Sequence, residues 1–491
     1  MEHVHIAIIG SGFGGLGMAI RLGQAGIDDY VVLERTDDLG GTWRDNSYPG
    51  CACDVPSHLY SFSFAPNPNW SRTFSPRPEI WAYLRDCADR FGVTPKIRFG
   101  TDVREAAWDG DRRRWVIETS GGTLTADAVV AAPGGLSEPS IPSLPGLAGF
   151  AGTAFHSARW RHDQDLTGRD VAVVGTGASA IQFVPEIQPR VRTLRVYQRT
   201  APWIVSKGDR PIRDWERRAY RAAPALQRLS RYGMYASRES LIVLFRHPRL
   251  ARAAQRVALR HLRRQVPDPA LRAKLIPDYT LGCKRILPSN DYLPALSRAG
   301  VELVTDPIAE VRAHAVVTAD GTERPADTII FGTGFAVTDP PIAHRVRGAD
   351  GRTLAEAWGG SPRAYLGTMI AGFPNLFMLL GPNTGLGHNS VVLMIEAQLK
   401  HVLDALRFLR GGGYAALAPR ADVQAAYSDR LDEELAGTVW NAGGCASWYL
   451  DSTGRNSTLW PGSTWSFRRR LSRLRPADYD LLRGAPAEVR T

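Results

Sequence analysis

Two glycine-rich segments have the residue types and the spacing needed to bind the phosphates of a dinucleotide. The first reads Gly10-Ser11-Gly12-Phe13-Gly14-Gly15 and closes the apolar run at residues 4–10. In this pattern Gly10 permits a tight turn, Gly12 lets the backbone approach a pyrophosphate, and Gly15 lets a helix pack closely on a strand. The unpaired N–H groups at the start of the following helix then face the phosphates.

The residue that ends the next apolar run indicates which dinucleotide binds there. This run, YVVLE, ends at Glu34, about 20 residues beyond the glycines, as the dinucleotide fingerprint requires. A carboxylate at this place accepts hydrogen bonds from a ribose 2′-OH and repels a 2′-phosphate. The first segment therefore predicts a site for FAD or NAD.

The second segment differs in the residue that follows it. Gly175-Thr176-Gly177-Ala178-Ser179-Ala180 also follows an apolar strand, but the next run, LRVYQRT, ends in Arg199 and Thr200. Arginine at this place accommodates a 2′-phosphate, which an acid would exclude, so this segment predicts NADP. Without this context Arg199 would be interpreted as a solvated surface charge. Its position after the glycines favours the interpretation that it binds the 2′-phosphate.

Apolar strands that end in glycine-rich turns also mark the domain boundaries. Residues 127–139 and 327–335 both have this form, and they are interpreted as the crossings into and out of an inserted domain. The sequence predicts an α/β fold with two Rossmann-like dinucleotide-binding domains, the NADP domain being inserted in a discontinuous FAD domain. The expected bounds are 1–138 and 327–491 for the FAD domain, 139–326 for the NADP domain, and 209–276 for an Arg-rich helical insert within the latter.

The positive charge of the chain is concentrated in this insert. Between residues 210 and 275 there are 16 Arg and one Lys against four acidic residues, whereas the net charge of all 491 residues is +11. A solvated helical face is the simpler interpretation, contact with a membrane surface is the alternative, and nucleic acid is not expected because no recognition motif is present. The apolar face is expected to contain Leu250, Ala254, Val257, Leu262 and Val266, and the charged face Arg252, Arg256, Arg260 and Arg264.

Composition sets the broad class of protein. A chain of 491 residues and 53.8 kDa, 44% hydrophobic and 22% charged, is expected to form several globular domains. Its five cysteines contain no C-x-x-C pair, so we expect no disulfide framework and no metal site. No apolar run is long enough to span a membrane and no signal peptide is recognised, which predicts a cytoplasmic protein.

A motif between the two predicted domains resembles that of a known enzyme family. Phe150, Gly152, His156 and Trp160 match F-x-G-x-x-x-H-x-x-x-W, the signature of the flavin-dependent Baeyer–Villiger monooxygenases. The family's next position is Pro or Asp, and this chain has Arg161 there. That departure keeps open the related flavin monooxygenases that oxygenate nitrogen or sulfur.

The resemblance covers essentially the whole chain and implies an activity. Family members use FAD, NADPH and O₂ to convert a ketone to an ester or lactone through a C4a-peroxyflavin. The segment Gly282-Cys283-Lys284-Arg285 resembles the family's active-site arginine segment. It implies that Arg285 stabilises the anionic oxygen species, that Asp54 anchors Arg285, and that Lys284 reaches the NADP 2′-phosphate or ribose.

The resemblance and the two fingerprints together give the predicted binding residues. The FAD residues are Gly10, Ser11, Gly12, Phe13, Gly15, Glu34, Thr42, Trp43, Asp54, Tyr60, Val103 and Asn383. The NADP residues are Gly175, Thr176, Gly177, Ala178, Ser179, Ala180, Arg199, Thr200, Lys284 and Arg285. We expect His156 to form a structural hydrogen bond rather than to transfer protons. A helix from about residue 389 to 406 is expected to direct its N-terminus toward the flavin.

Two other functions remain as alternatives at this point. A disulfide reductase could share the two-dinucleotide architecture, but Cys51 and Cys53 have the wrong spacing for its redox pair. A non-catalytic flavoprotein that docks on membranes through residues 209–276 would account for the charge of the insert.

Overall fold

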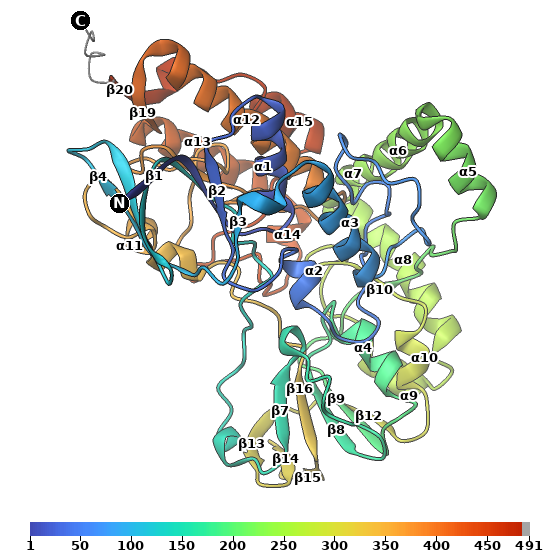
Figure 1. Ribbon diagram of the computed structural model, residues 1–491. Coiled ribbons are helices and arrows are strands. Elements are labelled where there is room, and N and C mark those ends of the chain that lie inside the picture. Colours follow the sequence, from blue (N-terminus) through green and yellow to red (C-terminus); the bar gives the residue numbers. More distant parts are fainter. Residues whose placement is uncertain (484–491) are drawn as a thin grey trace, which may run out of the picture.

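A mostly parallel sheet forms the first part of the structure, a computed structural model that describes residues 1–483 (Figure 1). Its strands are β1 (Glu2–Ile9), β2 (Tyr30–Leu33), β3 (Ile97–Arg98), β4 (Val103–Asp109), β5 (Arg114–Thr119), β6 (Gly122–Ala131), β17 (Val346–Arg347) and β18 (Leu376–Met378). They run in the order β17-β4-β5-β6-β1-β2-β3, and β18 also pairs with β6. Strand β1 is apolar throughout its second half because Ile6 and Ile8 pack in one core cluster and Ala7 and Ile9 in another, on the opposite face.

The second sheet consists of five parallel strands and lies below the first in Figure 1. The strands are β7 (Thr153–His156), β8 (Asp170–Val174), β9 (Thr193–Tyr197), β12 (Val301–Val304) and β16 (Thr328–Phe331), in the order β12-β9-β8-β16-β7. A small antiparallel sheet adjoins it, formed by β13 (Ile308–Arg312), β14 (Ala315–Thr318) and β15 (Glu323–Pro325). One mostly parallel and one parallel sheet, each with a glycine-rich turn after one of its strands, confirm the predicted fold class.

The position of β16 corrects one predicted boundary. We expected residues 327 onward to belong to the FAD domain, yet β16 pairs in parallel with β7 and β8 of the second sheet. An apolar strand such as TIIF fits the centre of either sheet, so its composition could not identify its neighbours. The chain leaves the second sheet only after Phe331.

A helix follows the glycine-rich turn of each sheet. Helix α1 (Phe13–Gln24) follows β1 and packs against the long helix α12 (Val391–Gly412). Helix α4 (Ala180–Ile187) follows β8 and the second glycine-rich segment. The remaining helices outside the insert are α2 (Thr42–Asp45), α3 (Arg77–Arg90), α10 (Tyr292–Leu296), α11 (Leu354–Trp358), α13 (Ala421–Ala436), α14 (Val439–Ala442) and α15 (Thr464–Arg470).

Short elements complete the described chain. Two small sheets are formed by β10 (Ile204–Val205) with β11 (Leu287–Pro288), and by β19 (Tyr414–Pro419) with β20 (Tyr479–Arg483). The 3-10 helices are η1 (Thr94–Lys96), η2 (Leu147–Gly149), η3 (Ser157–Arg159), η4 (Pro341–His344) and η5 (Pro476–Asp478).

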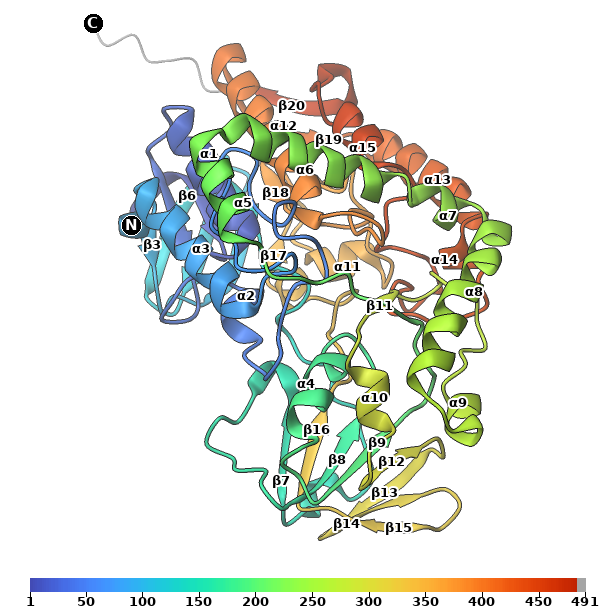
Figure 2. The same ribbon diagram turned by 90° about the vertical axis from the view of Figure 1, so that its right-hand side faces the viewer.

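The Arg-rich segment forms five helices that cross one side of the molecule as an arc (Figure 2). These are α5 (Asp214–Ala222), α6 (Pro224–Glu239), α7 (Ile242–Arg246), α8 (Pro248–Gln265) and α9 (Pro269–Lys274). Helix α6 of this segment contacts the first sheet's side of the molecule. The Gln227 amide donates to the Asn67 carbonyl at 2.7 Å, and Glu239 accepts from the Thr464 hydroxyl at 2.8 Å, both contacts with segments that belong to the first sheet's side.

The apolar face expected for α8 is buried only in part. Leu262 and Val266 are buried as expected, together with Ala251 and Ala258, whereas Leu250 and Val257 are 48% and 66% exposed. The buried stripe faces β10 and α10. These contacts decide which face of α8 is buried, and the periodicity of the segment alone does not reveal it. Leu250 and Val257 therefore lie in solvent among arginines.

A disulfide joins Cys283 to Cys445, whose Cα atoms lie 6.1 Å apart. No spacing in the sequence predicts this bond, because 162 positions separate the two residues. Within residues 1–483, no helix is both long and apolar enough to cross a membrane. The same residues contain no group of three or more His, Cys, Asp or Glu that could hold a metal ion.

Candidate cofactor and active site

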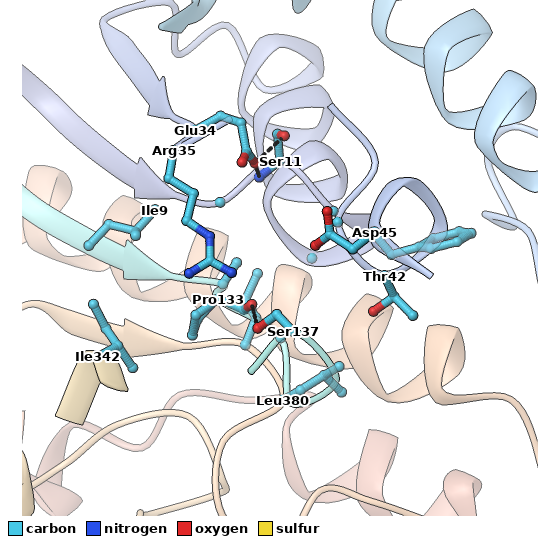
Figure 3. Close-up of a pocket in the computed structure, with 18 of the residues that line it drawn as sticks. Ile9, Ser11, Glu34, Arg35, Thr42, Asp45, Pro133, Ser137, Ile342 and Leu380 are labelled. Atoms are coloured by element: carbon cyan, nitrogen blue, oxygen red, sulfur yellow. Dashed lines mark hydrogen bonds between the residues drawn. The ribbon is translucent and has the colours of Figure 1, made fainter. Parts of the chain in front are cut away.

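A cavity lies at the carboxyl ends of β1, β2 and β6, beside the first glycine-rich segment (Figure 3). It contains about 1220 Å³ of empty space, including space open to solvent. Ligands of open parallel sheets bind at this edge, outside the carboxyl ends of the strands. Nine of the predicted FAD residues line it: Gly10, Ser11, Gly12, Phe13, Glu34, Thr42, Trp43, Tyr60 and Val103.

The backbone at the first turn explains two of the glycines. Gly10 has a φ of +96°, which side-chain-bearing residues rarely adopt, and a Cβ there would lie 2.6 Å from the Ala132 oxygen. Gly15 does not line the cavity, because it lies under the turn. A Cβ on Gly15 would lie 1.8 Å from the Gly10 oxygen, so only glycine lets α1 start this close to β1.

Glu34 is buried at the edge of the cavity and fully engaged in hydrogen bonds. Its Oε2 accepts from the Ser11 hydroxyl at 2.6 Å and from the Ser11 N–H at 3.1 Å, the contacts dashed in Figure 3. Its Oε1 accepts from the Thr36 hydroxyl at 2.9 Å and lies 3.0 Å from Arg44. Burial acts to raise the pKa of Glu34, but these hydrogen bonds and the Arg44 charge lower it below its usual value. Glu34 is therefore a fixed anion beside the glycine-rich turn.

Asn383 lies elsewhere than the resemblance implied. It does not line this cavity, and its side-chain amide donates to the carbonyls of Asn456 at 2.8 Å and Leu459 at 3.1 Å. Its side-chain oxygen accepts from Arg455 at 3.0 Å. Asn383 therefore links the C-terminal segment to the turn that precedes α12 through hydrogen bonds.

Several residues that sequence reasoning missed also line the cavity. They come from α2 and from the segments that follow β6 and β16, and include Arg44, Pro133, Ser137, Ile342 and Arg345. Only Arg44 and Pro133 are near a motif, so they alone could have been found from the sequence. Helix α12, expected at about 389–406, starts at Val391, which lines the cavity, and is followed by three further helices.

Arg285 and Asp54, the predicted active-site residues, form a bidentate ion pair although 231 positions separate them. Arg285 Nε donates to Asp54 Oδ2 at 2.8 Å, and Nη2 donates to Oδ1 at 2.6 Å. The Arg285 side chain is 38% exposed, and Nη1 makes no hydrogen bond with any residue from 1 to 483. The Asp54 charge raises the pKa of Arg285. Burial acts to raise the pKa of the Asp54 carboxyl, but the Arg285 charge lowers it below its usual value. Asp54 thus fixes a permanently charged guanidinium whose Nη1 group can still donate hydrogen bonds.

Tyr60 is an aromatic residue of the cavity that the charges of the ion pair affect. Tyr60 lines the cavity, and its hydroxyl accepts a hydrogen bond from Trp43 Nε1 at 3.2 Å. Burial raises the pKa of Tyr60, and the charges of Asp54 and Arg285 act on the same hydroxyl. Tyr60 is therefore a cavity residue on which the charges of the pair act.

The C-terminal segment holds the arginine loop in place. The Thr280 N–H donates to the Gly443 carbonyl at 2.9 Å, and the Cys283–Cys445 disulfide adds a covalent link two residues before Arg285. Burial raises the pKa of Tyr449 to about 12, and the charge of Arg285 acts on it in the opposite direction. Tyr449 is a further residue near the pair that sequence reasoning left unassigned.

The second glycine-rich segment lies between β8 and α4, and Arg199 follows β9 of the same sheet. The Thr176 hydroxyl donates to the Thr200 carbonyl at 3.2 Å, which fixes the end of the loop that carries Arg199. Burial and the nearby charge of Arg199 both lower the pKa of Lys284. Arg199 itself is exposed.

The signature motif forms the edge of the second sheet. His156 ends β7; its Nδ1 accepts from the Ala158 N–H at 3.1 Å, and burial lowers its pKa to about 4. Trp160 packs on Phe183 of α4, with ring centroids 5.4 Å apart. Phe150 packs on the core of this sheet, and a Cβ on Gly152 would lie 2.3 Å from the Asp327 oxygen. These contacts are structural, and Arg161 pairs with Asp163 at the surface.

The cysteines near the cavity do not form a redox pair. Cys51 and Cys53 are both buried thiols, and burial raises the pKa of Cys51 to about 11 and that of Cys53 further. Thiols with raised pKa values are poor nucleophiles near neutral pH. This geometry gives no support to disulfide reduction at this site.

The fold and the two sites define a flavoprotein-like oxidoreductase with places for two different dinucleotides. A family model described as pyridine nucleotide-disulphide oxidoreductase matches residues 7–213. A Baeyer-Villiger monooxygenase of Streptomyces coelicolor is 56% identical over 490 residues, which cover 99% of this chain and 94% of that protein. A Baeyer-Villiger monooxygenase of Pseudomonas aeruginosa is 51% identical over 470 residues, covering 95% and 89%.

A solved structure agrees with these relatives. Oxidized steroid monooxygenase bound to NADP has a TM-score of 0.86 and 31% identity to this chain, with 98% of this chain and 100% of that chain covered. The chain belongs to the Baeyer–Villiger monooxygenase family, and the resemblance stated from the sequence is confirmed.

Proposed function

We propose that the protein is an FAD- and NADPH-dependent Baeyer–Villiger monooxygenase that uses O₂ to convert a ketone to an ester or lactone. Family membership and the match to a structure that binds NADP support the reaction class and the coenzyme. The cavity beside Gly10 and Glu34 fits FAD, because it offers a glycine turn for the pyrophosphate and a fixed carboxylate for the ribose. Bound FAD would supply the electrons that activate O₂.

The observation that carries this proposal is the bidentate pair of Arg285 and Asp54. A guanidinium stays charged at every physiological pH, and it favours an anionic oxygen over a protonated one. Asp54 fixes the plane of the guanidinium, while Nη1 remains free to donate to a developing oxyanion. Anionic oxygen attacks a carbonyl carbon, whereas the protonated form oxidises amines and sulfides. The pair therefore favours ester formation over heteroatom oxygenation.

Arg199 and Lys284 are the proposed site of the NADPH 2′-phosphate. The two residues lie 85 positions apart in the chain, yet the charge of Arg199 acts on Lys284. Two cations bind a phosphate dianion better than one, and NADH offers no such group. We further propose that residues 139–331 form the NADP domain, that the rest forms the FAD domain, and that the enzyme works in the cytoplasm, where NADPH is available.

Isotope incorporation tests the reaction directly. FAD-loaded protein is incubated with NADPH, ¹⁸O₂ and a panel of cyclic and linear ketones, and in parallel with a tertiary amine and a thioether. We expect an ester or lactone with one ¹⁸O atom and one NADPH consumed per product. Exclusive oxidation of the amine or the thioether would overturn the proposal.

A further inference from the structure

The helical arc of α5 to α9 carries an unusual share of the apolar side chains that face solvent. Sixteen large hydrophobic residues are exposed in the described chain, and nine of them lie between Trp215 and Ile276. On α6 they follow one stripe, Leu226, Leu229 and Tyr232, the last two 67% exposed. Spacings of three and four residues place such side chains on one face of a helix. This helix therefore buries one face on the protein and leaves a second apolar face uncovered.

Exposed arginines lie on the same helices as these apolar residues. The side chains of nine of them make no hydrogen bond or ion pair with any residue from 1 to 483. They lie on α5 to α8: Arg218, Arg228, Arg246, Arg249, Arg252, Arg256, Arg260, Arg263 and Arg264. We call these arginines, with the apolar residues Leu226, Leu229, Tyr232, Leu250 and Val257, the arginine-rich face.

The four acidic residues of the same segment are all engaged within the protein. Asp214 pairs with Arg217, and Glu216 pairs with Arg210 at 2.7 Å. Glu239 accepts from Asn389 at 2.7 Å, and Asp268 caps α9 by accepting from the Ala270 N–H at 3.0 Å. The charge that the arginine-rich face offers to a partner is therefore entirely positive.

Helix α15 continues this face beside α6. The Thr464 hydroxyl lies 3.2 Å from the Tyr235 hydroxyl of α6, and the next residue, Trp465, is 59% exposed. Arg469 lies over the Trp465 ring at 5.5 Å, and Arg468 is exposed one turn along the helix. Tryptophan and arginine together are typical of protein surfaces that contact lipid headgroups.

We propose that the arginine-rich face binds an anionic lipid surface, with Leu229 and Tyr232 entering the headgroup region. The unpaired cations complement the negative charge of acidic lipids, and the exposed apolar residues supply the area that inserts. A second copy of the chain complements the face poorly, because a twofold interface would bring the nine arginines against one another. A nucleic acid would meet the cations but leave the apolar stripe in water.

Vesicle flotation of the FAD-loaded protein tests this inference. Vesicles of phosphatidylcholine with 30% phosphatidylglycerol are compared with pure phosphatidylcholine in low salt and in 0.5 M NaCl. We expect binding to the anionic vesicles alone and release at high salt, since the Debye length falls with ionic strength. Absence of binding to the anionic vesicles in low salt would overturn the proposal.

Variants assign the binding to the face. The triple variant R252Q/R256Q/R260Q should bind about 100-fold more weakly, from roughly fivefold per arginine near an anionic surface. L229D/Y232D should also lose binding, whereas R104Q/R169Q/R407Q, which removes three exposed arginines outside the face, should bind within twofold of wild type. NADPH oxidation with a ketone should be unchanged in all three.

Three results would contradict the proposal. One is equal loss of vesicle binding in the R104Q/R169Q/R407Q control. Another is a concentration-dependent dimer in sedimentation velocity that L229D/Y232D abolishes, which would assign the face to a second copy. The third is binding of duplex DNA as tight as that of the anionic vesicles. None of these readouts depends on turnover, so they are independent of the proposed reaction.

Discussion

Replacing Asp54 by Asn tests whether the carboxylate holds Arg285 in its working position. The change removes the negative charge of the carboxylate. It also removes one of the two oxygens that accept hydrogen bonds from Arg285 at 2.8 and 2.6 Å. Hydrogen bonds to charged groups contribute about 1.5–3 kcal/mol each, but water replaces part of this here, because Asp54 and Arg285 are 20% and 38% exposed. We expect a loss of about 1–2 kcal/mol in the free energy of unfolding, measured by urea denaturation followed through flavin fluorescence.

The pH dependence of this loss follows from the direction of the pKa shift. Burial raises and Arg285 lowers the pKa of Asp54, and the net pKa lies below its usual value. A depressed carboxyl pKa stabilises the fold fully above the unfolded pKa, about 3.9, and this contribution is lost only as the pH falls through the folded value. The difference between wild type and D54N should therefore be the same at pH 5.5 and pH 8.

Product coupling is the functional readout, and a surface pair provides the control. In D54N the fraction of NADPH that yields ester should fall at least tenfold, and hydrogen peroxide should account for the rest. Asp163 also pairs with an arginine through two hydrogen bonds, but both side chains are more than half exposed. D163N should leave both the free energy of unfolding and the coupling unchanged, because solvent screens an exposed ion pair. Wild-type stability and coupling in D54N would refute this account of the anchor.

Three further predictions concern the coenzymes and the cysteines. Arg199→Ala should raise the KM for NADPH at least tenfold and that for NADH less than twofold, measured by steady-state kinetics; equal effects on both would contradict the 2′-phosphate assignment. Gly15→Ala should abolish FAD retention, because the added Cβ would lie 1.8 Å from the Gly10 oxygen, whereas Gly23→Ala, with no atom within 4 Å of its added Cβ, should retain FAD. Thiol titration of the denatured chain should find three thiols before reduction and five after it, and five before reduction would exclude the Cys283–Cys445 bond.

The sequence predicted the fold well where local pattern and packing agree. The turn at Gly10 and the turn at Gly175 each combine a strand, glycines and a helix within about 20 residues, so both appear directly in the sequence. It failed at β16, whose membership of the second sheet depends on partners at β7 and β8, more than 150 residues earlier. The outward position of Leu250 and Val257 also depends on what packs against α8.

The candidate site likewise contains residues that the sequence predicted and residues that it did not. Nine cavity residues and the Arg285–Asp54 pair were anticipated because motifs identify them. Arg345 was missed because it reaches the cavity from an unmarked loop, and Asn383 was placed at the cofactor although its amide binds the C-terminal segment. The proximity of Lys284 to Arg199 is a product of tertiary structure, since the two belong to separate segments.

Replacement of Arg285 by Ala, with ester formation and NADPH consumption measured together, tests the central claim most directly. Loss of one preorganised oxyanion donor reduces turnover by about 10²–10³-fold, and the lost positive charge adds to this. We predict that R285A forms ester at least 10²-fold more slowly while continuing to oxidise NADPH and to release hydrogen peroxide. Ester formation at the wild-type rate in R285A would contradict the claim.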